Sequence, residues 1–524
     1  MKRKLLVCLL LAVLLLSGCQ ARQEEKMATD TVNPNEIVTL KAITMGAAPK
    51  SGLDSLYAEL DALTIPELGC ILRFTYIPWG DERNQINLAI ASGEYDFFPQ
   101  GNFTDYQLMA SRNAFLDIKP YLSLVPDLVA HYQLSGEDVL VSAEMDGKLY
   151  GIPQYGTPGV AANEGFLYRE DLRVTWGLAP ITDLATMEAY LYRAKEDEAF
   201  ADHALITDNR VWTSLWSILT KDQYFEITGF TDTPYVVSAI DAPYQVLSRM
   251  ETPEFRTMLE YLRKWYQDGI LDKRLLTLSS NEGASSLALF LAGDKPCETN
   301  SPIWSVNRDW IPALTEAHPE WSYGFWSYDQ GGRKLNYKSG AAHGSMIAIS
   351  SGTQHPEQAV RLLEKLHTDQ RYYDLLVYGV EGVHYHLDGD VVRSDDIPAD
   401  ETYVYWTASV DAYMDHTTVY CDNPAWTEGI YLPYLAMCDE LAEKAEYHPL
   451  NNFIFNAGNV TSQASKLAEA WNTYMMPLLC GLSEDIDAEL EMAIAQLKEA
   501  GLDEYLAEVQ QQLSDFEQAK VAEE

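Results

Sequence analysis

Cations are scarce in this sequence. Its 524 residues include 37 lysines and arginines against 78 aspartates and glutamates, so the formal net charge at pH 7 is −41. A surface of that sign repels nucleic-acid phosphates and anionic lipid headgroups, and it disfavours anionic ligands. The composition therefore argues against a nucleic-acid partner and fits a soluble body that its charge helps to keep in solution.

Long apolar runs are lacking apart from one near the start of the chain. Leu5 to Leu16 is apolar throughout and follows the cations Lys2, Arg3 and Lys4. The run is too short to span a bilayer and has the length of the apolar region of an export signal. No later stretch reaches the roughly 18 apolar residues of a membrane-spanning helix, so we expect no second span.

The apolar run ends in Leu16-Ser17-Gly18-Cys19, which resembles a lipobox. The resemblance implies a signal peptide over residues 1–18 and a lipid such as palmitate on Cys19, and a coincidental cysteine behind an ordinary signal is the alternative. Residues 20–35 are polar and lack aromatics, so 19–36 fits a flexible tether. We therefore expect a protein held at the extracellular face of the cell membrane by its lipid alone.

Cysteine pairs of the kind that bind metals are lacking too. Five cysteines follow Cys19, and none lies in a CxxC pair or near a histidine at zinc-ligand spacing: Cys70, Cys297, Cys421, Cys438 and Cys480. Metal and dithiol chemistry are therefore not expected. An odd number in an exported protein leaves at least one thiol unpaired, and disulfides among the others stay possible.

Catalytic motifs are also missing. The chain has no GxSxG, no HExxH, no P-loop and no catalytic-cysteine setting, and its many carboxylates would place some pair at a glycosidase separation by chance. His384 and His386 alternate, with Asp388 two residues further on, which is a conceivable metal cluster. A surface hairpin with an Asp388-Gly389 turn explains the pattern more simply. We expect no enzyme, no metal and no cofactor.

The regular elements begin with alternating strands and helices. Strands are expected at 37–45, 70–77 and 95–98, with helices at 53–63 and 79–91 between them. This rhythm predicts βαβ units and a largely parallel sheet. Later segments predict a strand at 344–350, a helix at 254–267, one long amphipathic helix at 355–376 and an acidic helical tail at 483–519.

Six short segments along the chain carry a resemblance to a known family: 77–80 (IPWG), 91–96 (ASGEYD), 146–153 (DGKLYGIP), 168–172 (YREDL), 378–385 (YGVEGVHY) and 501–505 (GLDEY). Together they resemble the large lipoprotein members of the extracellular solute-binding protein family of carbohydrate ABC transporters, most closely the LipO-like group of Firmicutes. Each piece is weak alone, but their order spans nearly the whole mature chain.

The resemblance implies an α/β, two-lobed periplasmic-binding-protein-like fold of type II, with the ligand in a cleft between the lobes. Lobe one would comprise 37–157 and 323–374, and lobe two 159–322 and 375–524. The first crossing is expected near 154–158 and the return near Phe325. The third crossing would follow the helix after the 344–350 strand.

A sugar needs flat apolar faces for its C–H surfaces and fixed polar groups for its hydroxyls. Candidates of both kinds lie at the ends of expected elements or in segments that resemble the family's cleft loops: Trp79, Gln100, Asn102, Gln154, Tyr155, Asn300, Trp304, Trp326, Glu381 and Tyr385. The alternative for the aromatics is burial in the core, and for Glu381 a structural capping role.

Two functions of different classes remain from the sequence. The first is a monomeric, lipid-anchored receptor that captures a carbohydrate, an oligosaccharide by preference, and delivers it to the permease subunits of an ABC importer. The second is a cell-surface glycoside-active enzyme or glycan adhesin on a similar anchor. Sugar binding without turnover separates the first from the second.

Overall fold

The structure is a computed structural model. It describes residues 37–523 except for 79–81, 102–103, 105, 135–138, 146, 156–158, 161–163, 228–233, 279–282, 340–344, 396, 399–400, 402, 404–405, 407–410, 452 and 454. The expected signal, Cys19 and the tether lie outside the described residues. Within them, no helix is both long and apolar enough to cross a membrane.

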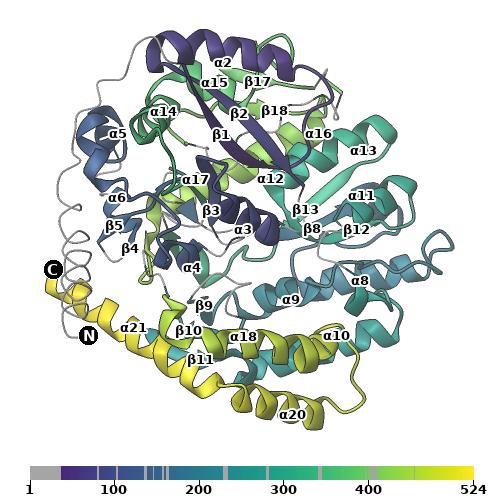
Figure 1. The fold of residues 1–524 in the computed structure, drawn as a ribbon. Helices are drawn as coiled ribbons and strands as arrows, with labels where there is room; N and C mark the ends of the chain where they lie inside the picture. The colour runs from purple at the N-terminus through teal and green to yellow at the C-terminus, as the bar shows by residue number, and fades with distance from the viewer. Residues whose placement is uncertain are drawn as a thin grey trace, which may run out of the picture.

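The upper part of the molecule, lobe one, is built on a five-stranded sheet in the order β2-β1-β3-β15-β6 (Figure 1). Its strands are β1 (Val38–Met45), β2 (Cys70–Ile77), β3 (Phe97–Gly101), β15 (Ser345–Ile349) and β6 (Gly151–Pro153). β1 pairs in parallel with β2 and β3, as expected. β15 runs antiparallel to both β3 and β6, so the sheet is mixed, because β15 enters it only after the chain has visited the other lobe.

Helices cover the lobe-one sheet through apolar stripes. α2 (Leu53–Leu68) buries Leu56, Leu60 and Leu68 at helical spacing and ends at Gly69, whose φ of 66° suits a residue without a side chain. α3 (Glu82–Ser92) confirms the second expected helix for the residues described. α2 packs against a core that includes Leu40, Phe97 and Ile347. α3 packs against a second core, which includes Phe98 and Met346.

The single helix expected at 355–376 is two helices. α14 (Pro356–Thr368) and α15 (Gln370–Val377) are separated by Asp369, whose extended backbone breaks the hydrogen-bond ladder and whose side chain accepts from the amide of Arg371. A capping aspartate within an apolar period ends one helix and starts the next. Both helices bury their apolar faces in lobe one.

The chain stays on lobe one beyond α15, which corrects the expected boundary at residue 375. Trp406 is fully buried there, with its ring centroid 5.2 Å from that of Phe97. The hairpin of β16 (His386–Asp388) and β17 (Val391–Arg393) follows α15, and β18 (Thr417–Val419) pairs with β17. The third crossing therefore lies near residue 420, since α16 (Pro424–Trp426) already packs in the other lobe.

Lobe two surrounds a three-stranded antiparallel sheet in the order β12-β8-β13. Its strands are β8 (Glu164–Arg169), β12 (Cys297–Pro302) and β13 (Tyr323–Ser327). Phe325 thus pairs within lobe two, so the expected start of the lobe-one segment at 323 is wrong for β13. Lobe two also carries the three-stranded sheet of β9 (Tyr224–Glu226), β10 (Val236–Ala239) and β11 (Ala242–Ser248).

Helices make the larger core of lobe two, at the bottom of Figure 1. They are α8 (Leu184–Lys195), α9 (Val211–Thr220), α10 (Pro253–Gln267), α18 (Thr461–Ala470), α20 (Ile486–Glu499) and α21 (Leu502–Glu523). Asp183 and Thr186 form a capping box at the start of α8. The expected helical tail is confirmed and is divided at Gly501, whose φ is 106°.

Next to the first crossing lies a small sheet of β7 (Gly159–Val160), β14 (Tyr337–Ser339) and β19 (Glu446–Tyr447). The first crossing is bound to the segment that leads to the third, since Tyr155 bridges to Asp411 and its backbone carbonyl accepts from the backbone amide of Ala412 at 2.7 Å. Segments far apart in sequence therefore form one hinge region.

A buried carboxylate fastens this hinge region to lobe one. Asp411 Oδ2 accepts from His131 Nε2 at 2.7 Å and from His367 Nδ1 at 2.9 Å, and its Oδ1 accepts from the amide of Tyr413 at 3.0 Å. Burial alone would raise the pKa of Asp411, but the hydrogen bonds from the two histidines outweigh it and lower that pKa. Asp411 is therefore an ionised, fully buried link between three distant segments.

Candidate functional site

One edge of the lobe-two sheet gathers the start of β8 and the ends of β12 and β13. The antiparallel register pairs Glu164 with Pro302 and Gly165 with both Ser301 and Ser327. The chain enters β8 from β7, so this edge lies next to the hinge region. Side chains at and just beyond the three strand ends are therefore brought together beside the crossings.

A hydrogen-bonded polar cluster stands at this edge. Arg210 Nη2 donates to Asp208 Oδ2 at 2.7 Å, and Asn300 Nδ2 donates to the same oxygen at 3.2 Å. Burial alone would raise the pKa of Asp208, but Arg210 outweighs it and lowers that pKa. Arg210 is about two-fifths exposed, at 43%, so part of the cluster faces solvent and can reach a ligand.

Two further carboxyls in this place have a buried oxygen without a hydrogen-bond partner: Glu164 through Oε2 and Asp329 through Oδ1. Burial raises the pKa of Glu164 to about 7, against a smaller lowering by Arg210. Burial likewise raises the pKa of Asp329. The hydroxyls of Thr299 and Ser301 are also buried without partners. Unsatisfied buried acceptors are costly, so this edge is suited to a ligand that donates hydrogen bonds.

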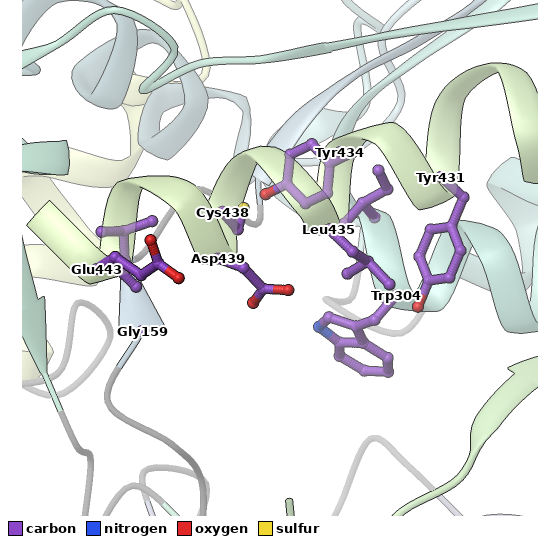
Figure 2. Close-up of a pocket in the computed structure, with 11 residues that line it drawn as sticks. Gly159, Trp304, Tyr431, Tyr434, Leu435, Cys438, Asp439 and Glu443 are labelled. Atoms are coloured by element: carbon purple, nitrogen blue, oxygen red, sulfur yellow. The ribbon is translucent and has the colours of Figure 1, made fainter.

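An aromatic groove of about 410 Å³ opens beside the cluster. Trp304 belongs to α12 (Ile303–Ser305) and has 47% of its surface exposed. It lies next to Leu435 of α17 (Leu432–Lys444) and Tyr431, the residue that directly precedes α17. Figure 2 shows Tyr431, Leu435, Asp439 and Glu443 following one another along one side of this helix. Their spacing of four residues makes a stripe that is apolar at one end and acidic at the other.

The groove and the polar cluster adjoin at Tyr434, which lines the groove. Burial raises the pKa of Tyr434, its neighbour Cys438 raises it further, and the carboxyls of Asp329 and Glu164 add to the rise. The aromatic groove and the polar cluster together offer apolar ring faces next to fixed hydrogen-bonding groups. This is the combination that a carbohydrate requires.

Among the described residues, no three histidine, cysteine, aspartate or glutamate side chains gather as a metal site. His384 is buried, and its Nδ1 accepts from the amide of Val380 at 2.9 Å. His386 and Asp388 belong to the β16–β17 hairpin, which confirms the expected turn. The five cysteines after Cys19 are all unpaired.

Two of the residues expected from the sequence meet at this site. Trp304 lines the groove, and Asn300 belongs to the polar cluster. Gln154 lies at the crossing and is partly buried, and its backbone amide donates to the backbone carbonyl of Ser345 at 2.8 Å. Trp79 and Asn102 lie outside the described residues.

The other expected residues lie elsewhere. Four are buried: Gln100, Tyr155, Trp326 and Tyr385. Gln100 accepts from the Thr104 hydroxyl at 2.8 Å, and Tyr155 stacks on Tyr132 with centroids 4.6 Å apart. All four side chains are therefore in contact with protein neighbours in this structure. Glu381 is exposed in the turn that bridges to Tyr385 on lobe one.

The sequence interpretation missed Glu164, Asp208, Arg210, Asp329 and the groove stripe of α17. Tyr431, Leu435, Asp439 and Glu443 recur every four residues, which was a readable helical signal. No sequence signal indicated the polar cluster, because its members come from separate loops that only the sheet edge brings together.

Replacing Glu164 by Gln should change the pH dependence of stability. Between the ordinary carboxyl pKa of 4.5 and about 7 the folded protein binds more protons than the unfolded chain. The free energy of unfolding of the wild type therefore falls as pH rises through this range. Glu164→Gln removes that fall, so the variant should gain at most about 3 kcal/mol over wild type on passing from acidic to alkaline pH.

Urea unfolding of both proteins across this pH range measures the difference. Glu59→Gln, at an exposed position of α2, is the matched control and should run parallel to wild type. If Glu164→Gln also ran parallel to wild type, Glu164 would be solvated and not a buried acceptor.

Residues 69–380 match the family model described as bacterial extracellular solute-binding protein. Residues 449–518 match a domain model of unknown function. A carbohydrate ABC transporter substrate-binding protein of Streptococcus pneumoniae serotype 4 is 23% identical over 505 residues, which are 91% of this chain and 90% of that protein.

Solved structures share the fold. The N-glycan transport solute binding protein NgtS of Streptococcus pneumoniae matches with a TM-score of 0.69 and 19% identity, over 92% of this chain and 99% of that one. An HMO-binding, ABC-transporter-associated solute binding protein of Bifidobacterium longum infantis matches with a TM-score of 0.62 and 15% identity, over 92% and 99%. These matches confirm the expected two-lobed arrangement of type II.

Proposed function

The chain belongs to the bacterial extracellular solute-binding proteins, whose model spans more than half of it, and we propose that it captures an oligosaccharide for an ABC importer. The receptor would act as a monomer outside the cell and present its loaded form to the permease subunits. Carbohydrate as the ligand class is supported by relatives such as NgtS, which has been crystallised with Man1GlcNAc and with Man5GlcNAc.

The observation that carries this proposal is the pairing of exposed Trp304 with unpartnered acceptors at the same sheet edge. The indole would stack on the C–H face of a sugar ring, with Tyr431 beside it. The carboxyls of Glu164 and Asp329 would accept from its hydroxyls, while Arg210 and Asn300 would donate to them. Acidic side chains dominate the surroundings, so the favoured ligand is a neutral glycan.

No bond needs to break in this mechanism. The ligand would bind between the lobes and favour the closed arrangement by the difference in its affinity for the two states. The hinge region that joins Tyr155 to Asp411 lies where the rotation must be absorbed.

Titration calorimetry of the mature protein against a panel of neutral oligosaccharides, including Man1GlcNAc, Man5GlcNAc and kestose, tests the proposal. We expect saturable binding of at least one member at a single site, and chromatography should recover it unchanged. A shortened sugar in the recovered ligand would favour a glycoside-active enzyme instead, and a panel without any binder would contradict carbohydrate capture.

We further propose that Cys19 anchors the receptor through a lipid, because it follows a short apolar run in a lipobox-like sequence. Cys19→Ala should abolish labelling by a palmitate analogue and should release the protein from the membrane or leave it unprocessed. Cys70→Ala, which changes a buried thiol of the mature body, should leave labelling intact. A Cys19→Ala protein that still carried label would contradict the anchor.

A further inference from the structure

A second hollow, of about 580 Å³, opens where the two lobes meet. Its lobe-one wall is β4 (Glu144–Met145), and its lobe-two wall is the chain around η7 (Ala457–Val460) together with α21. In Figure 1 β4 lies above α21 at the left of the molecule, on the other side from α11 and α13. We call this hollow the outer groove.

Each lobe supplies one wall of the outer groove. β4 pairs with β5 (Lys148–Leu149) just before the first crossing, and α4 (Tyr106–Ser111) of lobe one packs against η7. The lobe-two wall falls within residues 449–518, the segment whose family model has no assigned role. The width of the outer groove therefore depends on the angle between the lobes.

Apolar side chains from both lobes line part of the outer groove. Phe453 and Phe516 meet edge to face, with ring centroids 5.5 Å apart, and Met145 lies on the lobe-one wall. Phe516 is only partly buried. The two rings and the thioether form an apolar surface on which the C–H face of a sugar ring can rest.

The polar side of the outer groove is held in place before any ligand arrives. Glu508 Oε1 accepts from Asn459 Nδ2 at 2.9 Å and from Gln512 Nε2 at 2.8 Å, and Gln512 Oε1 accepts from the amide of Asn456 at 2.8 Å. The hydrogen bonds from Gln512 and Asn459 lower the pKa of Glu508, which keeps it ionised. Among the described residues both of these bonds use Oε1, so Oε2 remains to accept from a hydroxyl.

The charge of the outer groove restricts its occupant. Glu144, Glu508 and Asp515 are among the described residues that line it, and no lysine or arginine is. Lys119 forms an ion pair with Glu144 at 2.6 Å but is not among the residues that line the outer groove. An anionic ligand would be repelled here, whereas a neutral polyhydroxylated one finds amides, carboxylates and ring faces together.

We propose that the outer groove is a second carbohydrate subsite, which holds the far end of a neutral oligosaccharide whose near end lies at Trp304. This inference rests on the proposed function and gives residues 449–518 a role: they form the part of lobe two that receives the length of the chain. Because both lobes supply walls, a ligand long enough to reach the outer groove stabilises the closed state more than a short one.

The test compares ligand lengths. A glycan array of neutral oligosaccharides of graded length, including Man1GlcNAc and Man5GlcNAc, is first probed with the wild type. It identifies the shortest and the longest member of one series that the wild type binds. Wild type should bind the longest member more tightly than the shortest. Asn459→Ala and Phe516→Ala should each weaken binding of the longest member by about fivefold or more and leave the shortest unchanged.

Asn472→Ala, at an exposed position on the neighbouring helical segment, is the matched control and should bind both members as wild type does. Asn459 is itself exposed, so its variant should keep the melting temperature of the wild type. Equal affinity of wild type for both lengths, or an equal loss for both in Asn459→Ala and Phe516→Ala, would overturn the subsite. An array without any bound glycan would contradict the proposed function and the subsite with it.

Discussion

Trp304→Ala should weaken oligosaccharide binding by about 1–3 kcal/mol, or roughly 5- to 150-fold in Kd. The indole is a large, flat, half-exposed surface next to Tyr431 and Leu435, and its loss removes the stacking face of the aromatic groove. Because 47% of Trp304 faces solvent without ligand, its removal costs the fold little. Titration calorimetry measures the affinity, and thermal unfolding of the ligand-free protein measures the stability.

Trp304→Phe is the control for stacking, since it keeps a smaller aromatic face at the same place. Its affinity should lie between those of wild type and Trp304→Ala. If Trp304→Ala instead lowered the melting temperature strongly and left affinity unchanged, the tryptophan would be a structural residue and the groove would not hold the sugar.

Asp411→Ala should lower the free energy of unfolding by about 3–5 kcal/mol. The substitution leaves the imidazoles of His131 and His367 buried without the carboxylate that both contact, and it leaves the amide of Tyr413 without its acceptor. The lowered pKa of Asp411 adds a pH signature. Wild type has the full contribution above the ordinary carboxyl pKa and loses it as pH falls through the lowered one, whereas the variant shows no such loss.

Asp390→Ala is the matched control, because Asp390 also contacts a histidine, His416, at 2.9 Å but is 93% exposed. An exposed pair contributes little, so this variant should change stability by less than about 1 kcal/mol. Urea unfolding compares the two variants with wild type. If Asp411→Ala and Asp390→Ala were equally mild, the buried carboxylate would not fasten the hinge region.

The sequence predicted the helices and strands whose formation depends on residues close together in the chain. The strand predicted at 70–77 is β2, with the predicted ends. The helix predicted at 254–267 is α10, which begins one residue earlier at Pro253. Asp369 was the exception, because an aspartate within an apolar period can either face solvent or cap a new helix, and here it caps α15.

The site depended on contacts between distant segments, which a single sequence does not reveal. Tyr155 follows the crossing strand as a cleft residue would, yet it is buried because residues around Asp411 return to cover it. Trp304 lies just after β12 and Trp326 is the last residue but one of β13, and only the tertiary packing leaves the first exposed and buries the second. Gln100 is buried in the same way by its neighbours in the sheet.

The helix α17 shows a different limit. It has no buried residue, since its apolar positions are spread between the hinge side and the groove. The four-residue spacing of Tyr431, Leu435, Asp439 and Glu443 can be read from the sequence, but a helix without one buried stripe does not show which of its sides lines a groove. The groove was therefore found from the structure.

Small-angle scattering of the mature protein, with and without a saturating oligosaccharide that it binds, tests capture between the lobes most directly. The account predicts that the ligand reduces the radius of gyration and the maximum dimension, because contacts to both lobes favour the closed state. Identical scattering curves with a tightly bound oligosaccharide would contradict it.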